Sequence, residues 1–328
     1  MFNFKISVPF LAFLRNQIPF MEKAIGNQCA EAILFNREDL FGENWTTSWK
    51  NIKEAVSHFS PPNVSFHFPV NNSNYCEEKE IFEKLVEAYT RACDLGLAGV
   101  VVHSNNIRAI DAWSKSDEVA LSDGRKSVSD ALFRVKNSVT DSKNTWLSLE
   151  NMIIMDNYGK EIDPLFIYPE DFMELDESIG TVVDICHFFY TASVTVLAAQ
   201  AFTNLDSAST LQLQSAYHAT IEAENGSTVT LVPNLRPCDY DDIKKFRSVR
   251  HWHFSAFRGI AIPFTDQYCT EGVLPEEGDV PEDLYYAALS YISKSSSDHH
   301  VVLEIQEDDY DKRNKARYLI KKMQELTL

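Results

Sequence analysis

Residues 181–187 read TVVDICH, a short apolar stretch that ends in an aspartate and a histidine. A run of Thr, Val and Ile of this length predicts a buried β-strand, because β-branched side chains suit a pleated surface. Asp184 and His187 stand where this strand would stop. Since the carboxyl ends of parallel strands face one edge of a sheet or one mouth of a barrel, the stretch predicts part of a polar site.

Seven further stretches of this kind occur along the chain, and helical patterns separate most of them. The strand candidates are FKISV (4–8), AEAILF (30–35), VSFHF (64–68), GVVVH (99–103), TWLSLE (145–150), TVVDIC (181–186), WHFSAF (252–257) and HVVLEI (300–305). The helical patterns are clearest at 80–96, 127–139, 281–292 and 308–326. This alternation predicts an α/β fold in which residues 1–328 form a single (β/α)8 TIM barrel. An open doubly wound sheet is the alternative, although no glycine-rich phosphate-binding loop follows any strand.

One connection is much longer than the others. About 65 residues separate Cys186 from Trp252, between the sixth and seventh predicted strands. Connections of this length in compact domains usually have a function or carry structure of their own. We therefore expect a long helical insertion at about 190–235, which would serve as a lid or as a dimer surface.

Composition restricts the classes of partner. The chain has a formal net charge of −18, with 48 acidic and 30 basic residues, and this balance disfavours nucleic acid as a partner. No apolar run reaches the roughly 20 residues that a membrane span requires. The segment 1–20 lacks a basic leader and a cleavage site, so we expect no signal peptide. Six cysteines without a C-x-x-C pair indicate reduced thiols and a cytoplasmic location.

Six successive predicted strands carry a histidine or a carboxylate at or near the carboxyl end. These residues are His67, His103, Glu150, Asp184, His253 and Glu304, with His187 and His251 beside them. One such side chain is more often a packed core residue, but six at one mouth are costly unless a cation neutralises them. Mixed nitrogen and oxygen ligands suit Zn²⁺, Mn²⁺ or Co²⁺. We therefore predict one or two divalent ions, and favour His253 over His251 because it lies nearer the strand end.

The order and spacing of these strand ends resemble the xylose-isomerase-like barrel superfamily, which includes sugar isomerases and epimerases and the endonuclease IV group. The most specific motifs are L-E-N at 149–151 and D-x-C-H at 184–187, and the resemblance spans nearly the whole chain. It implies a cation held by Glu150, Asp184, His253 and Glu304, with Glu150 and Glu304 as the catalytic acid and base. In this isomerase arrangement, His187 and Arg258 would contact substrate oxygens.

The endonuclease IV group implies a different use of the same residues. Glu150 would bridge two ions, His67 and His103 would complete one position, and Asp184, His253 and Glu304 would complete the other. His187 would match a ligand of a third ion. The D-x-H motif of that group is replaced by Thr270-Glu271-Gly272-Val273, so we expect no third ion.

Three functions follow from the sequence. The first is a metal-dependent sugar or polyol isomerase or epimerase that acts on a small hydroxylated carbonyl substrate. The alternative is an endonuclease IV-like binuclear metal phosphodiesterase, which His67 and His103 favour. A barrel that only binds ligands is the third. The resemblance also makes a homodimer possible.

Overall fold

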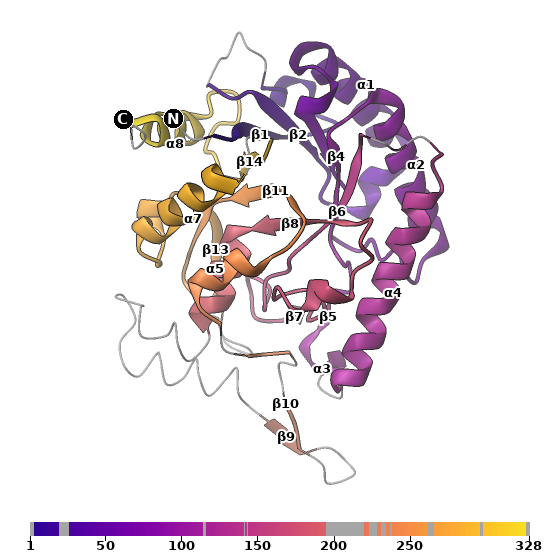
Figure 1. Cartoon of the computed structure of the whole chain (residues 1–328), viewed down its shortest axis with the longest axis vertical. Helices are drawn as coiled ribbons and strands as arrows, with labels where there is room; N and C mark the ends of the chain where they lie inside the picture. The colour runs from indigo at the N-terminus through magenta and orange to yellow at the C-terminus, as the bar shows by residue number, and fades with distance from the viewer. Residues whose placement is uncertain are drawn as a thin grey trace.

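The computed structural model describes residues 3–19, 26–113, 116–140, 142, 144–194, 220–222, 228–230, 234–236, 238–261, 266–295 and 298–325. Eight parallel strands close into a barrel in the order β1-β14-β11-β8-β6-β4-β3-β2, and helices surround it (Figure 1). The predicted TIM barrel is therefore confirmed. The barrel strands are β1 (Lys5–Leu11), β2 (Cys29–Ile33), β3 (Val64–His67), β4 (Gly99–Val102), β6 (Trp146–Glu150), β8 (Gly180–Asp184), β11 (Val249–Phe254) and β14 (His300–Leu303).

The longest outer helices form because each has apolar residues at helical spacing that become buried. In α2, residues at helical spacing such as Ile81, Leu85 and Tyr89 are buried, and the helix ends at Gly96 in the left-handed conformation (φ 68°) that glycine adopts freely. The helices are α1 (Gly42–Phe59), α2 (Lys79–Leu95), α3 (Ile110–Trp113), α4 (Glu118–Asn137), α5 (Ile185–Val194), α7 (Glu282–Ser295) and α8 (Asn314–Glu325).

The last helix begins later than the pattern at 308–326 predicts. Asp309 accepts hydrogen bonds from the backbone N–H groups of Asp311 and Lys312, which makes a turn, and Arg313 has a positive φ of 49°. The Arg313 guanidinium is buried and donates to the carbonyls of Pro9 and Gln17. These tertiary contacts hold the segment out of the helix, so α8 begins at Asn314.

The seventh strand also differs from its prediction at 252–257. It begins earlier, at Val249, and ends at Phe254. The residues after Ser255 leave the barrel as β12 (Ala256–Arg258), which pairs antiparallel with β13 (Thr270–Val273). A second small sheet joins β5 (Arg108–Ala109) to β7 (Glu161–Ile162).

The predicted insertion at 190–235 is described only in part. Its described segments are the end of α5, the short antiparallel pair β9 (Thr220–Glu222) and β10 (Thr228–Thr230), and residues 234–235. Residues 195–219, 223–227 and 231–233 lie outside the described residues, so the helical character of the insertion stays a prediction. Within the part of the chain that the structure describes, no helix has the length and apolar character needed to cross a membrane.

Strand register brings the polar strand ends to one level. His253 on β11 is paired with Asp184 on β8, and Glu150 on β6 is paired with Val182 on β8. His67 is the last residue of β3, while His103 and Glu304 directly follow β4 and β14. The mouth of the barrel therefore collects side chains that lie far apart in sequence.

Candidate metal centre

Glu150 lies at the centre of the mouth, at the end of β6, and its side chain is 1% exposed. Its Oε2 is 3.2 Å from His67 Nε2 and 3.1 Å from His103 Nε2. The two Nε2 atoms are themselves 3.2 Å apart. Three ligand atoms from three strands thus face one point.

The spacing of these three atoms fits a cation. Ligand atoms bound tetrahedrally to Zn²⁺ at about 2.0–2.1 Å lie roughly 3.3 Å from one another. His67 Nδ1 donates to the backbone carbonyl of Phe68 at 2.9 Å, so its Nε2 carries the lone pair that faces Glu150. The lone pair of His67 Nε2 and the carboxylate oxygen that faces it need a proton or a metal ion between them, and the donor set therefore fits a divalent ion.

The other carboxylate oxygen of Glu150 faces a second group of ligands. Glu150 Oε1 is 3.1 Å from His253 Nδ1, and Glu304 Oε2 is 3.4 Å from the same nitrogen. With Asp184 these residues offer four ligand atoms that all lie within 4.8 Å of one another. Glu150 is therefore placed to serve two ligand groups, one with each oxygen.

Asn151, the last residue of the L-E-N motif, joins the ends of two strands at this site. Its side chain accepts a hydrogen bond from the backbone N–H of Asp184 at 2.7 Å and donates to the Asp184 carbonyl at 3.3 Å. These contacts fix β6 against β8 where Glu150 and Asp184 project. The motif therefore contributes a ligand and the residue that sets its distance from the next ligand.

Glu150 and Glu304, two of the carboxylates at the mouth, differ in pKa. Burial raises the pKa of Glu150, but the imidazoles of His253 and His103 outweigh burial and hold it well below the usual range. Burial raises the pKa of Glu304 to about 8; Glu150 and Asp184 add to this effect, and His253 opposes it. At neutral pH in the metal-free site Glu150 is therefore ionised, whereas Glu304 is largely protonated.

His187, from α5, lies beside this site. Its Nδ1 donates to the backbone carbonyl of Asn151 at 2.9 Å, and its Nε2 is 3.8 Å from Asp184 and 4.0 Å from Glu271. Burial lowers the pKa of His187, but Asp184, Glu271 and Glu150 outweigh burial and raise it to about 9. Glu271 stands in the stretch that replaces the D-x-H motif, and no sequence pattern assigned it to the site. The predicted role of Arg258 stays a prediction, because Arg258 is exposed on β12 and lines neither cavity described next.

Two adjoining cavities of about 270 and 260 Å³ open onto the ligands, and they share Ile33, Phe35, His187, Glu271 and Glu304. Their walls are mainly apolar. Five carboxylates line them, whereas no Lys or Arg among the described residues does so. The carboxylates are Glu150, Asp156, Asp184, Glu271 and Glu304.

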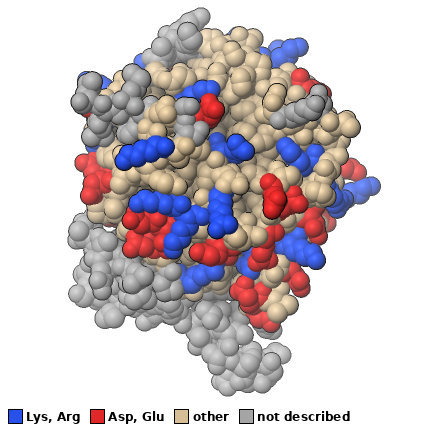
Figure 2. All heavy atoms as spheres, in the orientation of Figure 1, with Lys and Arg blue, Asp and Glu red and all other residues tan. Residues whose placement is uncertain are grey.

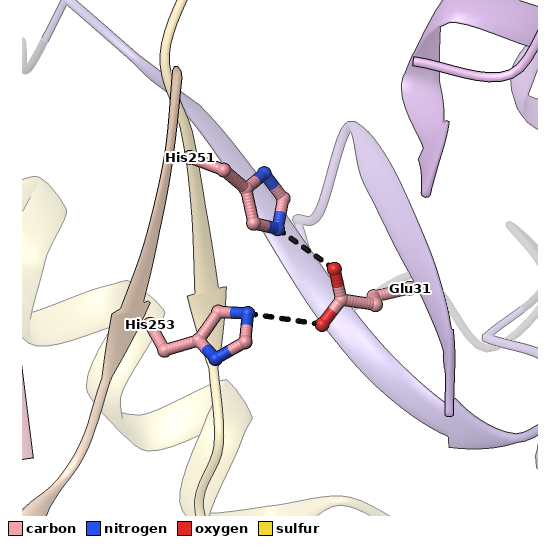
Figure 3. Close-up of side chains that lie close together, drawn as sticks. All are labelled: Glu31, His251 and His253. Carbon is pink, nitrogen blue, oxygen red and sulfur yellow. Dashed lines mark hydrogen bonds and ion pairs between the residues drawn. The ribbon is translucent and has the colours of Figure 1, made fainter. Parts of the chain in front are cut away.

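A second buried carboxylate lies deeper in the barrel. Glu31 on β2 is fully buried, and its side chain points toward His251 and His253 of β11 (Figure 3). Glu31 Oε2 is 2.7 Å from His251 Nε2, and Glu31 Oε1 is 3.1 Å from His253 Nε2. Sequence reasoning missed Glu31 because it considered only strand ends, although a single acid inside the apolar stretch AEAILF is a signal of a buried polar contact.

Comparison with known proteins gives the fold. No family model matches the chain, and no curated protein matches its sequence. Among solved structures, 3-keto-D-glucoside 4-epimerase YcjR from E. coli is similar with a TM-score of 0.54 at 14% identity, over 98% of this chain and 99% of that chain. Endonuclease IV from Thermus thermophilus is similar with a TM-score of 0.51 at 14% identity, over 98% of this chain and 99% of that chain.

A xylose isomerase domain protein from Planctomyces limnophilus is also similar, with a TM-score of 0.52 at 11% identity, over 99% of this chain and 96% of that chain. At these identities the comparisons establish the fold alone. The chain shares the (β/α)8 barrel fold of these structures, and this is the fold that its alternating strands and helices predict.

Proposed function

We propose that this chain is a divalent-metal-dependent enzyme that isomerises or epimerises a small hydroxylated carbonyl compound, such as a sugar or polyol derivative. The lining of the cavities is the observation that carries the proposal: five carboxylates and no described Lys or Arg face the substrate space. Asp156 and Glu271, which the proposed ion would leave free, can accept hydrogen bonds from substrate hydroxyl groups, and no described basic side chain is present to bind an anionic group. The apolar walls suit the carbon face of such a compound.

Glu150, Asp184, His253 and Glu304 would hold the ion, which can be Zn²⁺, Mn²⁺ or Co²⁺. When bound, it would polarise the substrate carbonyl and so increase the acidity of the neighbouring C–H group. Glu150 and Glu304 would then serve as the base and the acid. His187 lines both cavities and would orient a substrate oxygen through Nε2, since its Nδ1 is engaged with Asn151.

A second candidate function is binuclear phosphodiester hydrolysis. The observation that favours it is that the two carboxylate oxygens of Glu150 face different groups of ligands. Oε2 faces His67 and His103, while Oε1 faces His253. Two ions held by a shared carboxylate can stabilise the attacking and leaving oxygens of a hydrolysis. The face drawn in Figure 2 intersperses basic and acidic side chains without a continuous basic surface, and the net charge of −18 also disfavours a nucleic-acid substrate.

The names of the similar structures are compatible with either reaction, since one is an epimerase and one is endonuclease IV. We further infer a cytoplasmic location, which is supported by six cysteines that form no disulfide. We also propose that the chain forms a homodimer.

The decisive experiment compares the two reactions on the metal-loaded protein. In D2O, a panel of ketoses and 3-keto-glycosides is examined by NMR for deuterium at the carbon beside the carbonyl. Bis(p-nitrophenyl) phosphate and an abasic duplex are tested in parallel. We expect deuterium exchange and no phosphodiester cleavage, and cleavage without exchange would overturn the proposal in favour of the hydrolase.

The double variant His67→Ala/His103→Ala separates the mechanisms further. It removes the imidazoles on one side of Glu150 and leaves the ligand set of Glu150, Asp184, His253 and Glu304 intact. If the protein is an isomerase that uses one ion, the double variant should keep that ion and still exchange deuterium at carbon. A binuclear hydrolase should lose one ion and all cleavage.

A further inference from the structure

The two ring nitrogens of His253 face two different carboxylate groups. Nδ1 points to the mouth, where Glu150 lies at 3.1 Å and Glu304 at 3.4 Å. Nε2 points into the barrel interior, where Glu31 Oε1 lies at 3.1 Å (Figure 3). His253 Nε2 and Glu31 Oε1 are both buried, and neither forms a well-aligned hydrogen bond with any described group. The close contact between them is therefore an ion pair at 3.1 Å that holds the ring of His253 against Glu31.

Glu31 is itself held in place by two further groups. Ser65 Oγ of β3 donates to Glu31 Oε2 at 2.7 Å, and His251 Nε2 lies 2.7 Å from the same oxygen. Glu31, Ser65, His251 and His253 are all fully buried. A carboxylate accepts hydrogen bonds only, so His251 Nε2 is the donor in its contact with Glu31. The position of Glu31 is thus fixed by groups from β3 and β11.

We propose that Glu31 is a positioning residue for the metal centre: its carboxylate accepts the Nε2–H of His253 and so keeps the Nδ1 lone pair directed at the ion. A carboxylate behind a ligating imidazole fixes both its tautomer and its orientation. The inference rests on the proposed metal site but not on the reaction that the site catalyses. Glu31 lines neither of the two cavities at the mouth.

An ion held by Glu31, His251 and His253 themselves is the competing explanation, because their ligand atoms also lie within 4.8 Å of one another. The distances argue against it. His251 Nε2 and Glu31 Oε2 are 2.7 Å apart, which is a direct hydrogen bond and is shorter than the roughly 3.3 Å between two ligands of one zinc ion. At the mouth the corresponding distances are 3.1 and 3.2 Å, and Glu31 Oε1 also lies 3.1 Å from His253 Nε2, so only the short His251 contact distinguishes the interior cluster.

Zinc and cobalt binding to the full-length protein tests the proposal. Glu31→Gln keeps the size of the side chain but presents an amide to His253. We expect zinc affinity, measured by competition with a chelator, to fall about 10- to 100-fold, and the visible spectrum of the Co²⁺ form to change. Glu31→Asp, which keeps the charge, should recover part of the loss.

Asp171→Asn is the matched control. Asp171 is also a buried carboxylate, but it is paired with Arg125 and Arg236, and it does not line the cavities at the mouth. This variant should alter stability while its folded form keeps the wild-type zinc affinity and Co²⁺ spectrum. An unchanged affinity and spectrum in Glu31→Gln would overturn the proposal and leave the proposed function standing.

Two further results are informative even if Glu31→Gln does not fold. In wild-type protein with ¹⁵N-labelled histidine and zinc, we expect His253 to show a coordinated Nδ1 and a protonated Nε2. A coordinated Nε2, or an additional ion bound per chain at Glu31, would show that this cluster is a metal site and would overturn the positioning role. Wild-type protein that binds no divalent ion would overturn both this proposal and the proposed function.

Discussion

The barrel interior contains two buried carboxylates at different depths, and each is contacted by imidazoles from other strands. Glu150 lies at the mouth beside the cavities, with His67 and His103 at 3.2 and 3.1 Å. Glu31 is sealed inside, and the nearer of its two imidazoles is at 2.7 Å, with Ser65 as a further donor. We therefore propose that the same residue types form a cation site at the mouth and a hydrogen-bonded support below it.

Among the substitutions that test this comparison, Glu150→Gln should have the largest effect on metal binding and activity. The amide removes the charge from the centre of both ligand groups, so we expect metal binding and activity to be abolished while the fold is retained. Isothermal calorimetry with zinc and circular dichroism measure the two properties. Glu83→Gln is the control, because Glu83 is an exposed residue of α2. If the Glu150→Gln protein still binds metal and converts substrate, the mouth of the barrel is not the active centre.

Metal affinity at the mouth should depend on pH. Burial and the neighbouring carboxylates raise the pKa of Glu304 to about 8 in the metal-free protein. Below this pKa a proton must leave before the carboxylate can bind the ion, so affinity should rise by up to about tenfold per pH unit between pH 6 and 8 and then level off. Chelator competition across this range measures the slope. A flat profile would contradict Glu304 as a ligand.

Gly99→Ala should affect the deeper region through packing. A methyl group on Gly99 would overlap the ring of Trp146, which lies against His251 with ring centroids 5.1 Å apart. Overpacking of this kind costs about 1–3 kcal/mol. We expect urea unfolding of the metal-free variant to show this loss. Its folded form should keep the zinc affinity of the wild type to within a few fold, and a larger loss would mean that the mouth depends on packing at Trp146.

Ser65→Ala should have the smallest effect. It removes one donor to Glu31 Oε2, while His251 still donates to that oxygen and Oε1 keeps His253. We expect a loss of about 1 kcal/mol in the free energy of unfolding. Zinc affinity should fall less than in Glu31→Gln, and an equal fall would show that Ser65 rather than His253 transmits the effect of Glu31.

Much of the mouth could be predicted because its residues share a local rule. His67, Glu150 and Asp184 are the last residues of short apolar strands, and parallel strand ends meet at one mouth. Glu271 could not be predicted in this way, because it lies on β13 in a hairpin outside the barrel strands. The start of α8 was predicted too early for a similar reason, since the contacts of Arg313 with Pro9 and Gln17 are tertiary.

The sequence by itself determined the barrel and its metal-ligand candidates, because eight alternations of strand and helix admit few topologies and each strand end is visible locally. Only the tertiary structure decided how these groups are paired. Glu31 and His251 lie 220 residues apart and on strands that are not neighbours in the barrel, yet they are in hydrogen-bond contact. Closure of the barrel and the inward turn of alternate side chains produce that contact, and neither distance nor direction across the interior is encoded in any single stretch of sequence.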